Sequence, residues 1–224
     1  MTSSQTSRWT ALLIALMTLG GLRGLIEQPP GAIVPIHFGL DGTPNGWAPA
    51  WIGLLAVPGL TTFVWITLRW LSRTDPRAEN LHRSDRAVGS IWISIVLTLT
   101  LGQGFILSHT VNAPFPTPLL QHLAPGFLIG SLLIGSGNMF GKLRSNHIIG
   151  IRSPWTLSSD RVWDQTHRFA GRSFVLGGAL LIAGAAIPGW EPWQGPFIAI
   201  VMVTVIGGSY LKSYWLWRQE IRQG

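Results

Sequence analysis

Six apolar runs, each close to the length that crosses a bilayer, constrain this chain of 224 residues more than any other feature. A helix that crosses the hydrocarbon core needs about 20 mostly apolar residues. Such runs form helices because a backbone in lipid must satisfy its own hydrogen bonds. The sequence therefore predicts an all-α membrane protein, a bundle of about six transmembrane helices. The runs cover residues 9–26, 50–71, 87–108, 119–140, 173–189 and 194–211.

The charged residues indicate how these helices are oriented. Only 11% of the residues are charged, and 16 Lys and Arg against 9 Asp and Glu give a formal net charge of +7. Fifteen of the 16 basic residues lie at the chain ends or beside the connections after the second and fourth runs, all on one side of the bundle. The positive-inside rule makes that side cytoplasmic, so we expect both termini on the cytoplasmic side of the cell membrane. The positive charge thus indicates orientation, and we expect no direct contact with nucleic acid.

Catalytic and cofactor chemistry find little support in the sequence. The chain has no cysteine, which removes disulfides, thiolate metal sites and thiol catalysis. His37 and Asp41, with His109 and His122 at other outer helix ends, could be metal ligands, but their spacing is not that of a metal motif. The predicted spans hold neither a nucleophile–base pair nor an acidic pair. We therefore expect no enzyme, no catalytic residue, no metal and no cofactor.

The runs and their connections divide the chain into three parts. Residues 1–71 hold the first two spans and an ordered external loop at 29–49. Residues 72–118 hold a basic cytoplasmic loop and the third span. Residues 119–224 hold the last three spans and a long cytoplasmic connection at 141–172.

Two features inside the predicted spans bear on helix packing. Arg23 lies near the outer end of the first run, with Glu27 four residues later on the same helical face. This spacing favours an ion pair at the membrane surface over a buried functional charge. Small residues four positions apart let backbones approach closely, although Gly and Ala are common enough here for any one pair to occur without such a contact. These pairs are Gly126–Gly130, Gly137–Gly141 and Ala179–Ala183.

The external loop has the sequence of a compact structure. Its prolines favour extended backbone, and Asn45-Gly46 is a turn dipeptide. Ordered loops on a rigid scaffold commonly carry function. We interpret this loop as a ligand-facing surface, with a lid packed over the bundle as the alternative. The candidate residues are His37, Phe38, Pro44, Asn45, Gly46 and Trp47.

The connection at 141–172 is also more than a topological loop. Its basic residues could bind anionic lipid headgroups or a phosphate-bearing ligand, or could only enforce orientation. Asn146, Gly150, Pro154 and Trp155 in the same connection have no part in orientation. Structural hydrogen bonds under the bundle would explain them as well as a binding site would. The candidates for contact with a partner or with headgroups are Asn138, Lys142, Asn146, Gly150, Arg152, Pro154, Trp155, Thr156, Trp163 and His167.

A short amphipathic helix is predicted within this connection. Pro154 blocks a helix, and a nearby Ser or Thr can cap the helix that begins next. Val162, Thr166 and Phe169 share one face of that helix, with charged residues on the other. A short helix of this kind is expected to lie in the headgroup plane.

At these two loops the sequence resembles a known family. The internal segment carries Gly150-Ile151-Arg152-x-Pro154-Trp155-Thr156 and then Val162-Trp163-x-x-Thr166-His167-Arg168. It resembles the SdpI family of bacterial immunity proteins. The external Pro35-x-His37-Phe38 and Gly42-x-Pro44-Asn45-Gly46-Trp47 resemble the small domain of unknown function that often precedes it. The resemblance covers the loop after the first run and roughly residues 130–210.

This resemblance implies a multi-pass plasma-membrane protein that protects a cell from a secreted, membrane-active peptide toxin. It also implies a signalling role, in which the protein engaged by toxin holds a small winged-helix repressor at the membrane. On this basis the external loop would meet the toxin, and the basic internal segments would meet the repressor.

Two other function classes remain as alternatives to an immunity or sensor protein. A lipid-modifying enzyme would need a polar site at one interface, where His167 could act as base and Arg152 as anion clamp. A small transporter would carry ionisable residues deep in its spans, and Arg23 is the one such candidate. The immunity reading needs only a recognition surface, which the external loop supplies.

Overall fold

The computed structural model describes residues 4–39, 43–111 and 118–223, without the side chains of residues 118–122 and 191. Within these ranges the chain forms eight helices and one two-stranded antiparallel sheet. In chain order the elements are α1 Ser4–Ile26, β1 Ile33–Phe38, β2 Pro44–Pro49, α2 Ala50–Thr74, α3 Ala78–Arg83, α4 Asp85–Ser108, α5 Pro118–Phe140, α6 Pro154–Ser158, α7 Asp160–Ala185 and α8 Glu191–Gln223.

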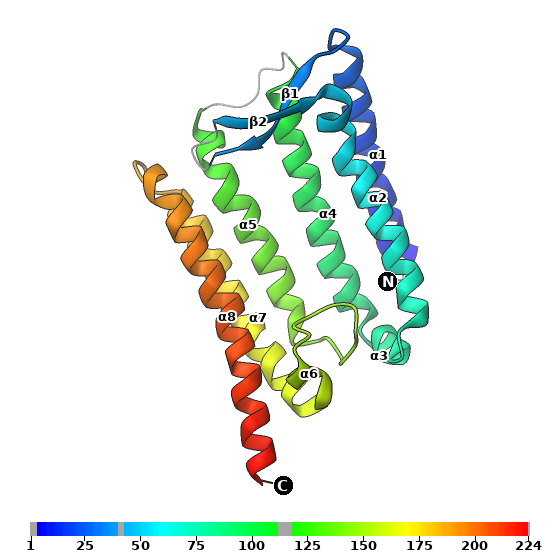
Figure 1. Cartoon of the computed structure of the whole chain (residues 1–224), viewed down its shortest axis with the longest axis vertical. Coiled ribbons are helices and arrows are strands. Elements are labelled where there is room, and N and C mark those ends of the chain that lie inside the picture. The colour runs from blue at the N-terminus through cyan, green and yellow to red at the C-terminus, as the bar shows by residue number, and fades with distance from the viewer. Residues whose placement is uncertain (1–3, 40–42, 112–117, 224) are drawn as a thin grey trace.

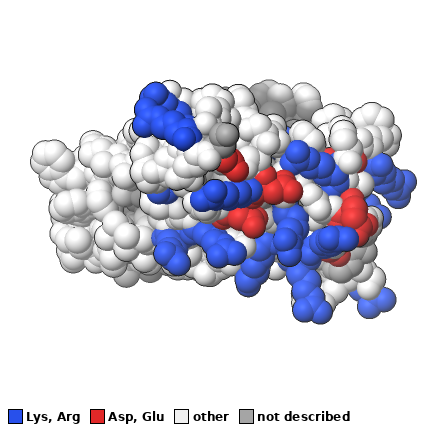
Figure 2. Space-filling model, turned by 90° about the horizontal axis from the view of Figure 1, so that it is seen from below, with Lys and Arg blue, Asp and Glu red and all other residues white. Residues whose placement is uncertain are grey.

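The long helices lie side by side, and the two ends of the bundle differ (Figure 1). At one end, here named the hairpin end, β1 and β2 lie across the helix termini. At the other, here named the basic end, lie α3, α6 and the connection between α5 and α6. Helix α1 begins and α8 ends toward this second end. Lys and Arg side chains gather there, as Figure 2 shows.

Five helices in the described residues are long and apolar enough to cross a membrane: α1, α2, α4, α8 and the part of α5 from Leu123 to Phe140. The chain is thus a multi-pass, mainly helical membrane protein, as predicted. The sixth predicted span, 173–189, falls in the second half of α7. That half is rich in Gly and Ala and is short, because Asp and Arg residues occupy the first half of α7 and the helix ends at Ala185. The sixth crossing and the orientation of the termini stay predictions.

The prediction of a separate short helix in the headgroup plane is wrong. It forms the first turns of α7, which continues without a break from Asp160 to Ala185. Gly171 falls in the middle of this helix, where it packs against the Gly137 carbonyl of α5. The prediction failed because the contact with α5 keeps the helix straight through a glycine that the sequence alone marks as a weak point.

Helices α5 and α7 pack closely against each other through their glycines. A Cβ on Gly178 would lie 2.4 Å from the Gly130 carbonyl oxygen, and one on Gly130 would lie 2.6 Å from the Gly178 oxygen. Gly126 packs against α7 in the same way, so the predicted Gly126–Gly130 pair is confirmed. Without a Cβ on either side, the two backbones can meet directly, as small residues allow in membranes.

The other two predicted small-residue contacts fail for reasons of position. Gly137 packs on α7, but Gly141 lies beyond the end of α5 and is exposed. Ala179 and Ala183 are also exposed, because they lie on a face of α7 that points away from α5. A spacing of four residues places two small residues on the same face of a helix, but it does not show whether a neighbouring helix covers that face.

The predicted ion pair near the C-terminal end of α1 is confirmed. The Arg23 Nε lies 3.0 Å from a carboxylate oxygen of Glu27, and the Arg23 side chain is 83% exposed. An exposed pair of this kind contributes little to stability. Arg23 therefore does not provide a buried charge for transport.

The largest cluster of buried apolar side chains lies toward the basic end. It joins Met17 of α1 and Trp92 of α4 to Leu143, Trp163 and Ala170 of the connection and α7. The indole N–H of Trp92 donates to Thr10 at 3.0 Å, which satisfies this buried donor. The connection after α5 is thus part of the core.

Replacing Gly178 with Ala tests the α5–α7 contact. The added methyl group would meet the Gly130 carbonyl at 2.4 Å, so the helices must separate. Overpacking of this kind costs about 1–3 kcal/mol, against a small gain in helix propensity. Thermal unfolding of the purified protein in detergent should show a clearly lower midpoint for Gly178→Ala.

Gly207→Ala is the matched control, because a Cβ on this α8 glycine meets nothing within 4 Å. It should unfold at or slightly above the wild-type temperature. Equal midpoints for the two variants would contradict the proposed tight contact.

Candidate functional site

At the hairpin end, the external candidates form a cross-strand arrangement rather than an irregular loop. Strands β1 and β2 pair antiparallel, with Pro35 opposite Trp47 and His37 opposite Gly46. The His37 ring Nδ1 and the Asn45 side-chain oxygen share a hydrogen bond. A Cβ on Gly46 would lie 3.0 Å from the His37 Cβ, so glycine leaves room for the histidine at this place.

Two contacts fix the hairpin on the helix ends. Val34 is buried against α2, where a Cβ on Gly53 would lie 2.4 Å from a Val34 methyl carbon. Phe38 packs against Phe105 and His109 at the end of α4, with ring centroids 4.8 and 4.7 Å away. The hairpin is therefore a built part of the bundle, and part of its predicted surface serves as an anchor.

The six external candidates separate into two groups by exposure. His37, Asn45 and Trp47 are exposed, with Trp47 at 57%. Phe38, Pro44 and Gly46 are half-buried. Side chains of the first group can contact a ligand, and residues of the second group hold the first group in place. Both the ligand-facing and the lid interpretations of this loop thus describe part of the hairpin.

At the basic end, Asn146 organises the connection between α5 and α6. Its side chain is fully buried, and its oxygen accepts hydrogen bonds from the backbone N–H groups of Ile148 and Ile149 at 2.9 and 2.8 Å. Its amide nitrogen donates to the Arg144 carbonyl at 2.8 Å. One side chain therefore satisfies three backbone groups that a non-helical segment leaves unpaired.

His167 and Trp163 hold the same segment from α7. The His167 Nε2 accepts from the Ile151 N–H at 2.9 Å, and its Nδ1 donates to the Trp163 carbonyl at 2.9 Å. The two rings stack with centroids 4.0 Å apart. The Trp163 indole N–H donates to the Leu143 carbonyl at 2.8 Å. Both side chains are fully buried, so these bonds form away from water.

Gly150 is required where the connection meets His167. Its φ is +120°, and a Cβ there would lie 2.5 Å from the His167 Nε2. Any side chain would both strain the backbone and displace the histidine. The motif thus has a glycine at position 150 because the backbone there lies close to the His167 imidazole.

Pro154 begins a helix rather than blocking one. It occupies the first position of α6, where its missing N–H costs nothing. Ser153 caps this helix in a capping box with Thr156, and Ser159 caps α7 as predicted. The Thr156 hydroxyl also donates to the Ile151 carbonyl at 2.7 Å.

Trp155 links α6 to the last helix. Its ring packs against a group of aromatic side chains on α8 at centroid distances of 5.0, 4.9 and 6.4 Å. The partners are Tyr210, Tyr214 and Trp217. The Trp155 of the motif is therefore a packing residue between two elements, and it is half-buried.

Asp75, directly after α2, is a site residue that was not among the candidates predicted from the sequence. Its buried carboxylate accepts hydrogen bonds from the backbone N–H groups of Arg77 at 2.6 Å and His147 at 3.0 Å. The His147 ring nitrogen lies 3.2 Å from the same carboxylate. Asp75-Pro76 directly after an apolar run is a turn signal that could have suggested a fixed position.

Neighbours of Asp75 strengthen this docking of the 75–84 segment onto the connection. Arg77 donates to the Leu157 carbonyl at 3.0 Å and to the Ser145 hydroxyl. Asn80 donates to the Ser145 carbonyl at 2.9 Å. The Ser84 hydroxyl accepts from the Arg144 N–H at 2.8 Å. These pairs are more than 55 residues apart in sequence, so no local pattern indicates them.

Hydrogen bonding decides the charge state of Asp75. Burial by itself raises the pKa of this carboxyl, because it disfavours the charged form. The backbone N–H groups of Arg77 and His147 and the His147 ring act in the other direction, and the balance leaves the pKa below its ordinary value of 3.8. Asp75 is therefore a carboxylate at neutral pH.

The internal candidates also divide into buried and exposed residues. Asn146, Thr156, Trp163 and His167 are buried, Gly150 and Trp155 are half-buried, and Asn138, Lys142, Arg152 and Pro154 are exposed. The buried residues satisfy the backbone of the connection. The exposed residues are the part of the motif that can contact a partner or a lipid headgroup.

This arrangement offers little for acid–base or metal chemistry. Both ring nitrogens of His167 are hydrogen-bonded to backbone, and the Arg152 guanidinium donates to the His147 carbonyl at 2.5 Å. Across the described residues, no three His, Cys, Asp or Glu side chains lie together as a metal site. Two of the considered ligands, Asp41 and the His122 side chain, lie outside the described part of the chain.

Comparisons with known proteins agree with the family resemblance seen at the two loops. Residues 142–211 match the SdpI/YfhL protein family, and residues 31–62 match a domain of unknown function, DUF1648. The immunity protein SdpI of Bacillus subtilis (strain 168) is 32% identical over 81 residues. This match covers 36% of the chain and 36% of that protein, so it spans about a third of the relative. No solved structure matches the chain. The predicted resemblance is confirmed: an SdpI-family region follows a DUF1648 region.

The buried His167 should make stability depend on pH. Desolvation lowers its pKa from 6.5 to about 4, although the hydrogen bond to the Trp163 carbonyl opposes this shift. Between these values the unfolded chain binds a proton that the folded chain does not. The free energy of unfolding should therefore be highest above pH 6.5 and fall by up to about 3 kcal/mol as the pH decreases toward 4.

The measurement is denaturant or thermal unfolding in detergent between pH 7.5 and 4.5. His167→Gln should be less stable throughout but should lose most of the pH dependence. His82→Gln, which alters an exposed histidine of α3, should keep the wild-type slope. A wild-type slope in His167→Gln would show that another group causes it.

Proposed function

We propose that this chain, with its SdpI-family region behind a DUF1648 region, is an integral membrane immunity protein. It would protect the cell from a secreted, membrane-active peptide toxin. The observation that carries this proposal is the 32% identity to the immunity protein SdpI over 81 residues. The five apolar helices support it, because they place the chain in the membrane that such a toxin attacks.

The charge distribution supports a cytoplasmic basic end. Lys and Arg are concentrated there, and the positive-inside rule assigns that side to the cytoplasm. Both termini would then be cytoplasmic, and the hairpin would face outward. This orientation puts the hairpin where a secreted toxin arrives.

The hairpin is the surface that we assign to the toxin. It presents His37, Asn45 and Trp47 from a pair of strands fixed on the helix ends. A large aromatic ring held on a rigid element is a good anchor for binding, because little conformational entropy is lost. Trp47 is thus the residue from which we expect the largest contribution.

Helix α2 offers a direct route from the hairpin to the basic end. Strand β2 passes into α2 at Pro49 and Ala50 without an intervening loop. Helix α2 ends at Thr74, and the next residue, Asp75, accepts a hydrogen bond from the backbone N–H of His147 in the connection. A toxin-dependent shift of the hairpin would therefore move a helix whose other end is bonded to the cytoplasmic site.

A small winged-helix repressor is the cytoplasmic partner that we propose for this site. Lys142, Arg144 and Arg152 are exposed on the connection and present a positive surface. A repressor held there would be kept from DNA while toxin occupies the outer surface. The lipid-modifying enzyme and the transporter gain no comparable support, because His167 is committed to backbone and Arg23 to Glu27.

Loss of Trp47 should weaken protection. In a toxin-sensitive bacterium that expresses the chain, Trp47→Ala should raise susceptibility to membrane-active peptides from sibling strains by about tenfold or more, since anchor tryptophans carry over 2 kcal/mol. Growth inhibition at matched membrane abundance is the measurement. Trp193→Ala is the control, because Trp193 is 63% exposed at the start of α8 and is not part of the hairpin. If deleting the whole gene leaves susceptibility unchanged, the immunity proposal is lost.

Charge reversal should separate the repressor surface from the other basic residues. The Lys142→Glu, Arg144→Glu double variant should abolish toxin-dependent recruitment of a fluorescent repressor to the membrane, because rim charges steer association. Arg218→Glu, Arg222→Glu carries the same change of charge on exposed residues of α8 and should recruit normally. Equal loss in both variants would mean that only the overall charge of this end matters.

A further inference from the structure

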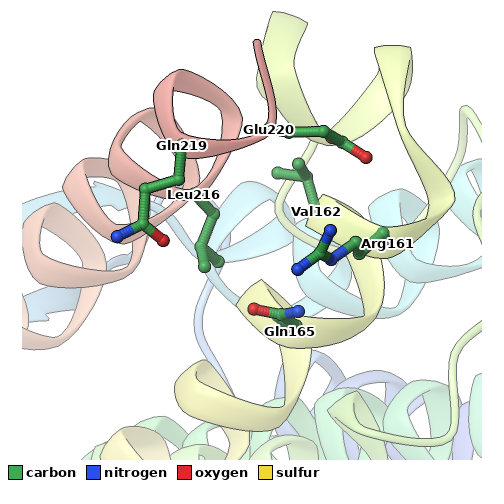
Figure 3. A pocket seen from close by; sticks show the side chains of 6 residues that line it. All are labelled: Arg161, Val162, Gln165, Leu216, Gln219 and Glu220. Carbon is green, nitrogen blue, oxygen red and sulfur yellow. The ribbon is translucent and has the colours of Figure 1, made fainter. Parts of the chain in front are cut away.

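A small polar pocket lies between α7 and α8 at the basic end, apart from the connection. Its enclosed volume is about 20 Å³, within about 220 Å³ of empty space that includes the open surroundings. Figure 3 shows Arg161 and Gln165 of α7 facing Leu216 and Gln219 of α8 across this space. The buried side chains of Val162 and Leu216 form an apolar floor under these polar groups. Glu220 completes the lining.

The pocket holds one cation and one carboxylate that are not paired with each other. Within the described residues, Arg161 makes no ion pair, and the adjacent Asp160 is engaged by Arg77 at 3.6 Å. Glu220 accepts a hydrogen bond from the Ser159 hydroxyl at 3.0 Å, which fixes the carboxylate at the rim. A carboxylate has about four acceptor positions, so it keeps capacity for a cationic donor.

Aromatic residues place the pocket at the level of lipid headgroups. Tyr214, Trp215 and Trp217 surround Leu216 in sequence, and Trp215 is 50% exposed. The Lys212 ammonium lies 4.1 Å from the Trp215 ring centroid. Tyr and Trp with neighbouring Lys mark the membrane–water interface, where an amphipathic ring is stable. The pocket therefore opens where phosphates and amines of lipids are concentrated.

We propose that this pocket binds the headgroup of a zwitterionic aminophospholipid. The phosphate would lie at the Arg161 guanidinium and the Gln165 and Gln219 amides, which are its only strong donors among the lining residues. The primary ammonium would donate to Glu220. A purely anionic headgroup leaves Glu220 facing negative charge, and a quaternary ammonium cannot donate a hydrogen bond. The charge pattern thus selects phosphoethanolamine over phosphoglycerol and phosphocholine.

The test is selective lipid retention by the purified full chain. The protein in detergent is exposed to equal amounts of phosphatidylethanolamine, phosphatidylcholine and phosphatidylglycerol, washed, and its retained lipid is quantified by mass spectrometry. Wild type should enrich phosphatidylethanolamine. Arg161→Gln should lower its retention by about tenfold, the loss expected for one charge-assisted hydrogen bond.

Glu220→Gln should retain phosphatidylethanolamine and phosphatidylcholine equally. It still offers an oxygen to Ser159, so the start of α7 is preserved. Arg218→Gln is the matched control, because this exposed arginine of α8 lies over the Tyr214 ring and outside the pocket. It should behave as wild type, and circular dichroism should show equal helicity in all variants.

Several outcomes would overturn the proposal. Equal retention of the three lipids would remove it, as would a preference for phosphatidylglycerol, which would indicate general attraction of anions. Equal effects of Arg161→Gln and Arg218→Gln would show that the pocket is not the site. Displacement by inorganic phosphate as effective as by glycerophosphoethanolamine would indicate a free-phosphate site.

Discussion

The non-helical backbone between α5 and α6 sets the main constraint on this structure. At the end of a membrane bundle, backbone N–H and C=O groups outside a helix need partners, since their burial without hydrogen bonds is costly. Here the partners are side chains of the segment itself, of α7 and of the segment after α2. Asn146 pairs within the segment, Trp163 and His167 pair from α7, and Ser84 and Asp75 pair from the segment after α2. Removing one of these groups leaves a buried backbone group without a partner.

This constraint explains why much of the family motif is buried. A motif in a loop between helices is easily taken for a binding site, yet Gly150, Trp163 and His167 here contact backbone and one another. The neutral His167 accepts a backbone N–H, a role that a protonated imidazole cannot fill. The exposed basic residues of the same segment remain accessible for the contact that we propose. The buried part of the motif therefore supports an exposed surface.

Two other features connect this site to the rest of the membrane bundle. The direct contact of Gly130 with Gly178 brings α5 and α7 together, and Gly137 with Gly171 continues it to the basic end. This places the connection between two helices that cannot separate without exposing polar backbone. On the other side, α2 runs from the hairpin to Asp75, so both loops of the chain are connected to one continuous helix. The two regions that match known families are thus joined mechanically, although they are far apart in sequence.

The sequence alone was enough for the membrane class, the apolar helices, the Arg23–Glu27 pair and the family resemblance, because hydropathy, charge and helical spacing are local properties. It also indicated that a Ser or Thr caps the helix after Pro154, since capping depends on the next three residues, and the structure selects Ser159. It did not reveal the role of Asp75, the continuity of α7 through Gly171, or the exposure of Ala179. Those depend on which residues of distant segments meet, and Asp75 and His147 are 72 residues apart. Only the tertiary structure decided which residues of the motif are buried, because burial and hydrogen-bond partners are set by packing between helices and not by the spacing of residues along them.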